Sequence, residues 1–322
     1  MRKKVLCIIK LYPAVAEKLE KDCDVIYISE ENRENILAKL IDVAALISIP
    51  SLKIDEDLLR AAPHLKVVSN VAVGYNNFDL EALNQRKVWA CHTPGVLNDT
   101  TADLVMALIL STARRIPELD YLVRSGRWPS VEEKDLFGLD VHHKKVGIIG
   151  MGRIGGAVAK RCHLGFNMEV SYFNRKPLAE QDNPYGYTYK SLDQICQESD
   201  FIVLMPPLTE ETRHLIGQRE LSMMKKTAIL INASRGPVID TEALVKALEN
   251  KQIAGAGIDV YDKEPIGAEH PLLAFPNVVA LPHIGSATDQ TREAMAKLAI
   301  DNVLAVLNGR KPLTPVPESF FF

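Results

Sequence analysis

An apolar strand that runs directly into a glycine-rich turn narrows the choice of fold for this 322-residue chain more than any other feature. Residues 146–155 read Val-Gly-Ile-Ile-Gly-Met-Gly-Arg-Ile-Gly, and residues 156–163 continue with the composition of a helix. Gly-x-Gly-x-x-Gly between a strand and a helix is typical of a dinucleotide-binding turn, and a tight turn that binds nothing is the alternative.

Each glycine of the turn has an expected task. Gly150 would permit the tight turn, Gly152 would let the backbone approach a pyrophosphate, and Gly155 would let the helix pack on the strand. The N–H groups at the helix N-terminus would then face the phosphates. The candidate cofactor-binding residues here are Gly150, Met151, Gly152, Arg153, Ile154 and Gly155.

The end of the next predicted strand, residues 169–173, indicates which dinucleotide binds. An acidic residue about 20 positions after the glycines holds the ribose 2′-hydroxyl of NAD. Here, 24 positions after Gly150, the sequence reads Asn174-Arg175-Lys176 and has no acid. Arg175 would clamp a 2′-phosphate through its planar fork, with charge from Lys176 and a donor from Asn174. We expect a preference for NADP(H) that does not exclude NAD(H); an exposed basic turn is the alternative.

Short apolar runs alternate with helical segments along the whole chain. Strands are expected at 4–9, 24–28, 44–49, 66–70 and 88–91, and again at 146–150, 169–173, 201–205, 228–232, 256–260 and 278–281. Helices are expected between them, and the two longest are at 99–115 and 286–307. The shorter helices of the first series are expected at 14–21, 34–41, 56–61 and 80–85. Such alternation favours parallel sheets with helices on both faces.

The fold class that follows is α/β, with two doubly wound parallel-sheet domains. We predict that a Rossmann dinucleotide-binding domain, residues 98–289, is inserted into a flavodoxin-like substrate domain, residues 1–97 and 290–322. The final long helix would lead the chain back to the first domain.

Composition excludes several classes of protein. The net charge of −3 gives no support to a nucleic-acid binder, and no apolar run approaches the roughly 20 residues of a membrane-spanning helix. The five cysteines are scattered and form no C-x-x-C pair, so neither a disulfide framework nor a metal site is expected. These features favour a cytoplasmic protein.

Three more loops follow predicted strands of the second series. They are Asn-Ala-Ser-Arg-Gly at 232–236, the acidic stretch 259–265, and Pro-His-Ile-Gly at 282–285. Ligands of open α/β sheets bind at the carboxyl ends of the strands, and an arginine there suits a carboxylate. Taken singly, each loop also has a plain interpretation as a surface arginine, a solvated acidic loop or a loop histidine.

In this order, the motifs resemble the D-isomer-specific 2-hydroxyacid dehydrogenases. The resemblance covers nearly the whole chain, including residues 70–77 and Thr-Ala-Asp-Leu at 101–104. Within the family the chain is most similar to glyoxylate/hydroxypyruvate reductases and 2-ketogluconate (2-ketoaldonate) reductases. Residues 137–142 and 166–168 favour the latter.

The resemblance implies a role for each matching residue. His283 would donate a proton to the keto oxygen, Glu264 would pair with His283, and Arg235 would hold the substrate carboxylate and polarise the carbonyl. Backbone N–H groups at Val73 and Gly74 would contact the carboxylate from the other domain. The implied cofactor contacts are Pro206, Ala233, Ser234, Asp259, which would lie near the nicotinamide carboxamide, and Gly285.

Two positions depart from the family pattern. Asn76-Asn77 stands where many relatives carry Asp-Asn, so the contacts of this loop are open. Asn174 replaces the acid of NAD-dependent members, which affects the choice of cofactor and not membership of the family.

The expected function is NADPH-dependent reduction of small 2-keto acids, namely glyoxylate, hydroxypyruvate or 2-ketogluconate, to D-2-hydroxy acids. The family also implies a homodimer, through residues 99–140. A nucleotide-sensing, corepressor-like binding protein on the same fold is the alternative. An L-specific lactate or malate dehydrogenase would carry its glycine-rich turn near the N-terminus, whereas here the turn starts at Gly150.

Overall fold

The computed structural model describes residues 2–28 and 32–319, which form two compact units. The first unit contains Met1–Leu97 and Ala287–Phe322, and the second contains Asn98–Ser286. The chain returns to the first unit at Ala287, three residues before the boundary expected at 290. Ala287 and Thr288 belong with the final helix because the Thr288 hydroxyl caps it by accepting from the Thr291 N–H.

The first unit is built on a parallel sheet with the strand order β2-β1-β3-β4-β5, the flavodoxin-like order. Its strands are β1 (Lys3–Cys7), β2 (Cys23–Tyr27), β3 (Ala45–Ser48), β4 (Val67–Asn70) and β5 (Trp89–Cys91). Its helices are α1 (Pro13–Asp22), α2 (Arg33–Ala38), α3 (Glu56–Ala61), α4 (Leu80–Gln85) and α11 (Asp289–Leu307).

Local sequence explains where these elements begin. Asp55 and Asp79 cap α3 and α4, each carboxylate accepting from a backbone N–H three residues later. All four residues of β3 and of β4 are buried, as expected for central strands of a parallel sheet. Helix α11 packs on β3, β4 and β5, so the chain returns to the first unit at its end.

The second unit is built on a seven-stranded parallel sheet with the order β12-β11-β10-β9-β6-β7-β8, a Rossmann order with one added strand. Its strands are β6 (Lys145–Ile149), β7 (Glu169–Phe173), β8 (Thr188–Tyr189), β9 (Phe201–Leu204), β10 (Ile229–Asn232), β11 (Gly255–Ile258) and β12 (Val278–Ala280). Its helices are α5 (Asn98–Ala113), α6 (Ile116–Arg124), α7 (Arg153–Phe166), α8 (Leu192–Glu198), α9 (Gln218–Met223) and α10 (Thr241–Glu249).

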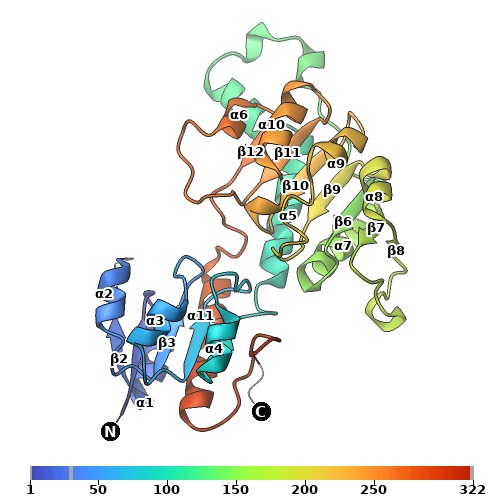
Figure 1. The fold of residues 1–322 in the computed structure, drawn as a ribbon. Coiled ribbons are helices and arrows are strands. Elements are labelled where there is room, and N and C mark those ends of the chain that lie inside the picture. The colour runs from blue at the N-terminus through green and yellow to red at the C-terminus, as the bar shows by residue number, and fades with distance from the viewer. Residues whose placement is uncertain (1, 29–31, 320–322) are drawn as a thin grey trace. The chain divides into compact units, whose positions relative to one another are not determined.

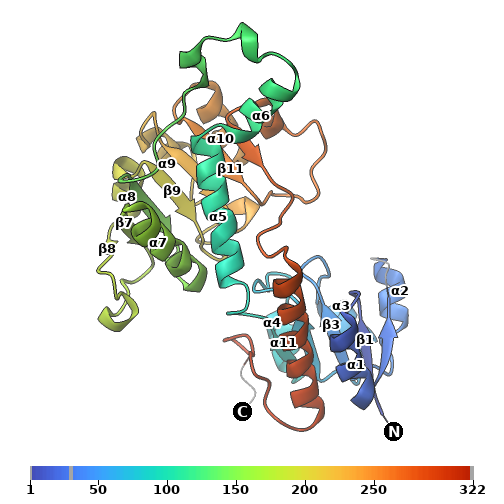
Figure 2. The same ribbon diagram turned by 180° about the vertical axis from the view of Figure 1, so that it is seen from behind.

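Helices cover both faces of the seven-stranded sheet. Ile148 and Val203 point to one face and pack in a core with residues of α5 and α7, the face turned to the viewer in Figure 2. Ile149 and Leu204 point to the other face and pack with α8, α9 and α10 (Figure 1). Neighbouring residues of one strand thus enter different cores, which explains the unbroken apolar runs of these strands.

The predicted fold class is confirmed, and two short elements are additions to it. Strand β8 escaped prediction because it has two residues, both exposed. Helix α6 follows the long helix expected at 99–115 and has no counterpart among the expected helices; Arg115, with a left-handed φ of 55°, separates it from α5. Within residues 2–28 and 32–319, no helix combines the length and apolar composition needed to cross a bilayer.

Candidate active site

The glycine-rich turn between β6 and α7 is packed too tightly for side chains at two of its glycines. Gly150 has a φ of 98°, and a Cβ there would lie 2.5 Å from the Met205 carbonyl carbon and the Pro206 nitrogen. A Cβ at Gly155 would lie 2.4 Å from the Gly150 oxygen. A Cβ at Gly152 would meet no described atom within 4 Å. Gly150 and Gly155 therefore serve the packing of the turn, whereas Gly152 borders open space.

This open space suits a dinucleotide pyrophosphate. The first N–H groups of an α-helix have no acceptor inside the helix, and Gly152, the N-cap of α7, has no side chain to offer one. The start of α7 can therefore bind phosphate oxygens through its backbone, and the residues present fit the cofactor that the sequence predicts.

Asn174, directly after β7, is bound to the same turn. Its Oδ1 accepts from the Met151 N–H at 2.7 Å, and its Nδ2 donates to the Met151 carbonyl at 3.3 Å. Both ends of the amide thus contact the glycine-rich turn. Because Nδ2 carries a second hydrogen, donation from Asn174 to a 2′-phosphate stays a prediction. Arg175 and Lys176 follow and are exposed.

The loop after β10 carries Arg235 and is shaped by Asn232. The buried Asn232 side chain accepts from the Ser234 N–H at 3.1 Å and donates to the Arg235 carbonyl at 3.0 Å. The Arg235 guanidinium donates to the Ser234 carbonyl at 2.6 Å. A Cβ on Gly236 would come within 2.1 Å of the Tyr261 carbonyl oxygen. The Arg235 loop therefore packs directly on the segment that follows β11.

That segment leads to Glu264, which is hydrogen-bonded to His283. Nδ1 of His283 lies 2.6 Å from Oε2 of Glu264, and Oε1 of Glu264 accepts from the Tyr261 N–H at 2.9 Å. Because an ionised carboxylate only accepts, Nδ1 carries a proton and Nε2 is left for another partner. The imidazole remains 46% exposed, so a substrate can reach it.

The charge of Glu264 is favoured by its surroundings. Burial alone would raise the pKa of the carboxyl, but the His283 hydrogen bond, the Tyr261 N–H and the positive charge of Arg235 hold that pKa below its ordinary value of 4.5. Glu264 is therefore an anion at neutral pH and can stabilise an imidazolium. Burial also lowers the pKa of Arg235, an effect that Glu264 opposes.

Asp259 fixes the backbone next to His283. It is 1% exposed, and its two oxygens accept from the N–H groups of Ile284 at 2.8 Å and Gly285 at 2.9 Å. His283 itself has a left-handed φ of 55°, which is uncommon outside glycine. Burial raises the pKa of Asp259, and the two N–H groups oppose that rise. The carboxylate thus holds His283 in an unusual backbone conformation.

Val73 and Gly74 lie in the first unit, in the turn that follows β4. Nδ2 of Asn70 donates to the Gly74 carbonyl at 3.2 Å and to Oδ1 of Asn77 at 2.8 Å. Asn77 in turn donates to the Leu52 carbonyl at 2.8 Å. The Asn76-Asn77 loop, which the resemblance left open, is therefore held by side-chain amides.

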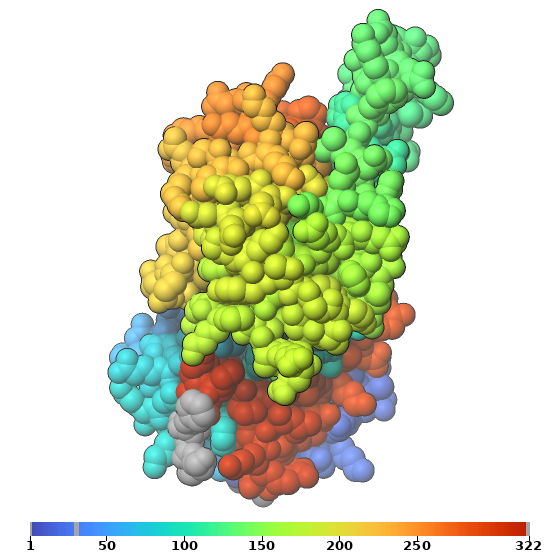
Figure 3. Space-filling view, turned by 90° about the vertical axis from the view of Figure 1, so that its right-hand side faces the viewer, coloured from blue at the N-terminus to red at the C-terminus, as the bar shows by residue number. Residues whose placement is uncertain are grey.

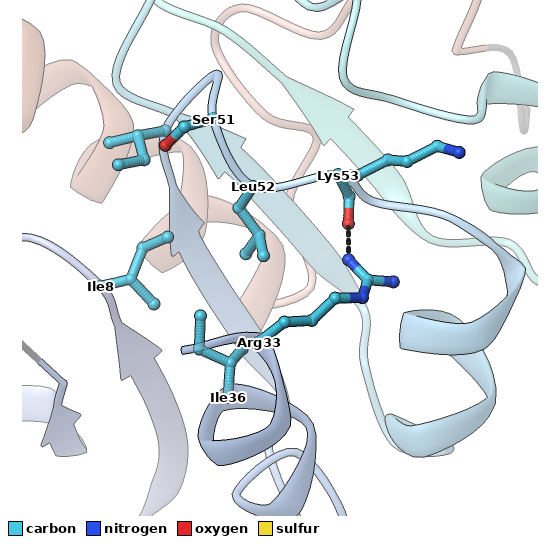
Figure 4. Close-up of a pocket in the computed structure, with 7 residues that line it drawn as sticks. Ile8, Arg33, Ile36, Ser51, Leu52 and Lys53 are labelled. Atoms are coloured by element: carbon cyan, nitrogen blue, oxygen red, sulfur yellow. Dashed lines mark hydrogen bonds between the residues drawn. The ribbon is translucent and has the colours of Figure 1, made fainter. Parts of the chain in front are cut away.

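A cavity of about 200 Å³ also lies in the first unit, beside the ends of β1 and β3 (Figure 4). Of its two cationic residues, Arg33 donates to the Lys53 carbonyl at 2.8 Å and pairs with Asp55 at 2.5 Å, and the Lys53 side chain extends away from the other lining residues (Figure 4). Because the Arg33 charge is already paired, the Lys53 side chain points away and no predicted site residue lines the cavity, we do not place the substrate carboxylate there. The lining residues are Ile8, Arg33, Ile36, Ile49, Ser51, Leu52 and Lys53.

Known proteins resemble this chain over most of its length. Residues 106–285 match the family model described as D-isomer specific 2-hydroxyacid dehydrogenase, NAD binding domain. The glyoxylate/hydroxypyruvate reductase B of Erwinia tasmaniensis is 50% identical over 307 residues, covering 93% of this chain and 95% of that protein. The corresponding reductase of Klebsiella pneumoniae is 52% identical over 259 residues, covering 80% of each.

A solved structure of a related reductase has a similar fold over the whole chain. The NADPH-dependent glyoxylate/hydroxypyruvate reductase of Sinorhizobium meliloti, in complex with NADP and malonate, has a TM-score of 0.90 and 34% identity and covers 100% of this chain and 98% of that one. The chain belongs to the D-isomer specific 2-hydroxyacid dehydrogenase family.

In this 2-hydroxyacid dehydrogenase, the second unit brings Arg235, Glu264 and His283 to loops at the carboxyl ends of three successive strands. Asn232 is not among the residues to which the sequence assigns a role. An asparagine at the end of a predicted strand is typical of an Asx-turn, in which its side chain accepts from the N–H two residues later, as Asn232 does from Ser234. Among the described residues, no group of three His, Cys, Asp or Glu side chains is placed to hold a metal ion.

Proposed function

We propose that this chain reduces small 2-keto acids to D-2-hydroxy acids with NADPH. The observation that carries the proposal is the hydrogen-bonded pair of His283 and Glu264, next to which the Arg235 loop packs directly through Gly236 on the Tyr261 backbone. A proton donor and a carboxylate-binding guanidinium are the two groups that reduction of a 2-keto acid requires.

Each side chain has a defined task in this reaction. The reduced nicotinamide, when bound, supplies the hydride that adds to the keto carbon. Glu264 holds Nδ1 of His283, so that Nε2 gives its proton to the keto oxygen, which becomes the hydroxyl group. Such a positioned proton transfer contributes about 10²- to 10⁴-fold to the rate. Before the transfer the ring carries protons on both nitrogens, and the Glu264 carboxylate stabilises this imidazolium. After the transfer the ring is neutral and keeps its Nδ1 proton on Glu264.

Arg235 would bind the substrate carboxylate through two parallel hydrogen bonds, which a lysine cannot reproduce. We also propose that the N–H groups of Val73 and Gly74 contact this carboxylate. Asp259 would act mainly by holding the backbone after His283, since both of its oxygens already accept from N–H groups.

For the cofactor we propose NADPH, with NADH as the weaker alternative. The backbone from Gly150 to Gly155 would hold the pyrophosphate, and Arg175 and Lys176 would meet the 2′-phosphate. The remaining proposed cofactor contacts are Pro206, Ala233, Ser234, Asp259 and Gly285. The S. meliloti relative, described as NADPH-dependent and containing NADP, supports this choice.

The relatives also suggest the substrates. Because those at about 50% identity are glyoxylate/hydroxypyruvate reductases, we propose glyoxylate and hydroxypyruvate. We keep 2-ketogluconate as a third candidate, on the strength of residues 137–142 and 166–168.

We further propose a homodimer formed through the segment from α5 to residue 140. Helix α6 has no buried residue, and Tyr121 and Val123 are 65% and 51% exposed. Trp128 and Phe137, in the green segment that projects from the second unit in Figure 3, are 59% and 65% exposed. Side chains this large and apolar suit a surface that a second copy covers.

The direct test uses purified wild-type protein, NADPH or NADH in parallel, and a panel of 2-keto acids. We expect turnover of glyoxylate and hydroxypyruvate, with NADPH favoured at least about tenfold in kcat/KM, as one lost charge-assisted contact would give. Tight NADPH binding without turnover of any keto acid would support the nucleotide-sensing alternative and contradict the proposal.

A further inference from the structure

The turn proposed to bind the substrate carboxylate is touched by a histidine that has no role in the function proposed above. His92 directly follows β5 and is only 8% exposed. Its Nδ1 lies 2.8 Å from the carbonyl oxygen of Val73. Because a carbonyl oxygen can only accept, Nδ1 carries the proton and His92 is the donor.

The histidine is itself held in place. Its ring packs edge-on against Tyr75, with centroids 5.4 Å apart and an interplanar angle of 87°. Its carbonyl accepts from the Thr314 hydroxyl at 2.6 Å, and its N–H donates to the Thr314 carbonyl at 3.2 Å. The next residue, Thr93, donates its N–H to the Ala72 carbonyl at 2.8 Å. The His92 ring is therefore a fixed donor to the turn at residues 72–74, which is also held by the N–H of Thr93.

The contact between His92 and the Val73 carbonyl also determines the direction of the Gly74 N–H, because both groups belong to one planar peptide bond. In a trans peptide the carbonyl of one residue and the N–H of the next point in opposite directions. When His92 holds the Val73 carbonyl, the N–H of Gly74 must point away from His92. Asn70 fixes the next peptide in the same way by donating to the Gly74 carbonyl. Two side-chain donors thus set the direction of successive N–H groups in the turn.

We propose that His92 is a positioning residue for carboxylate binding: it orients the Gly74 N–H by holding the Val73 carbonyl. The inference rests on the proposed function, in which Val73 and Gly74 contact the carboxylate of a 2-keto acid. It adds a specific requirement, namely a donor at the position of Nδ1 and not merely a buried side chain of the right size.

Two substitutions separate these requirements. In His92→Asn the amide nitrogen can take the place of Nδ1, whereas in His92→Gln the nitrogen falls nearer the place of Nε2. We expect His92→Gln to raise KM for glyoxylate and hydroxypyruvate about 3- to 10-fold, the effect of one lost neutral hydrogen bond. His92→Asn should restore KM to within about twofold of wild type, and kcat and the KM for NADPH should change little in both.

His163→Asn is the matched control, because His163 is a half-buried histidine on α7 that contacts Tyr185 and Tyr187. It should leave every kinetic constant unchanged. If His92→Gln does not fold, Thr314→Val removes the hydroxyl that holds the His92 carbonyl and should raise the same KM by a smaller factor.

The outcomes distinguish the inference from its premise. Equal KM values for His92→Gln and His92→Asn, or a change confined to the KM for NADPH, would overturn the role of His92 while the proposed function stands. A wild-type protein that turns over neither keto acid would overturn the proposed function itself. A KM rise in His92→Gln that His92→Asn reverses supports the inference.

Discussion

At the scale of single residues, the proposed chemistry depends on how firmly the imidazole of His283 is held. His283 is oriented by Glu264 through its ring and by Asp259 through its backbone. The two acids differ in what they touch: Glu264 is hydrogen-bonded to the ring itself, whereas Asp259 accepts from the backbone N–H groups of Ile284 and Gly285. We therefore expect Glu264 to stabilise the charge of the ring and Asp259 to maintain the conformation of the loop.

Replacing His283 by alanine removes the proposed proton donor without touching the glycine-rich turn. We expect kcat for glyoxylate to fall at least about 100-fold while NADPH still binds, because positioned proton transfer contributes about 10²- to 10⁴-fold. Steady-state kinetics and a fluorescence titration with NADPH measure the two effects separately. Turnover near the wild-type level would mean that another group supplies the proton.

Asp259→Asn tests the positioning of His283. An amide can accept from only one of the two N–H groups and presents a donor to the other, so the loop should move. We expect kcat to fall about tenfold or more, with a loss of about 1–3 kcal/mol in the free energy of unfolding. Asp200→Asn is the control, because Asp200 also binds a backbone N–H, that of Lys145. It should lower stability and leave kcat unchanged; an equal loss of kcat in both variants would argue against a specific role.

At the scale of elements, the proposed preference for NADPH depends on the turn after β7. In this turn Asn174 is bound to Met151, whereas Arg175 and Lys176 are exposed. Removing the Asn174 side chain would disturb the pyrophosphate turn together with the ribose site. Arg175 is therefore the cleaner position at which to test cofactor choice.

Arg175→Ala should raise KM for NADPH about tenfold and leave KM for NADH unchanged, because only NADPH carries the 2′-phosphate that a charge-assisted contact would hold. The NADPH advantage of the wild type should also shrink as salt screens the exposed ion pair. Arg219→Ala, at an exposed arginine paired with Asp193, serves as the control. An equal loss with both cofactors would assign Arg175 a purely structural role.

The elements also show what a sequence can and cannot predict. Helices α3 and α4 and strand β7 have the expected bounds, because their caps and apolar runs are local signals. The exposed strand β8 and the unburied helix α6 lack such a signal. The contact between His92 and Val73 spans 19 residues and joins two strand ends, so it depends on the tertiary fold.

At the scale of the whole molecule, the alternation of apolar runs and helical segments predicted both sheets. It also predicted that the chain leaves the first unit, forms the second and returns to the first. The path from the first unit to the second and back follows from the two long helices α5 and α11, which the sequence marks clearly. The loops that carry the proposed site residues were predictable from their place after each strand, whereas the roles of Arg235, Glu264 and His283 come from the family resemblance and stay predictions. The pairing of their side chains with Met151, Tyr261 or Ile284 depends on packing that periodicity does not encode.

The proposed homodimer is tested at this scale. Changing Tyr121 and Val123 together to aspartate places two charges on the exposed face of α6, where burial against a second copy would be costly. We expect sedimentation velocity to show a dimer for wild type and a monomer for the double variant. Leu164→Asp, at a side chain 55% exposed on α7, should remain dimeric. A wild-type monomer would contradict the proposed assembly.

The most direct test of the central claim is the stereochemistry and stoichiometry of one reaction. Wild-type protein is given hydroxypyruvate and a limiting amount of NADPH, and the glycerate formed is separated on a chiral column. We expect one D-glycerate for each NADPH consumed. Formation of L-glycerate, or consumption of NADPH without glycerate, would contradict it.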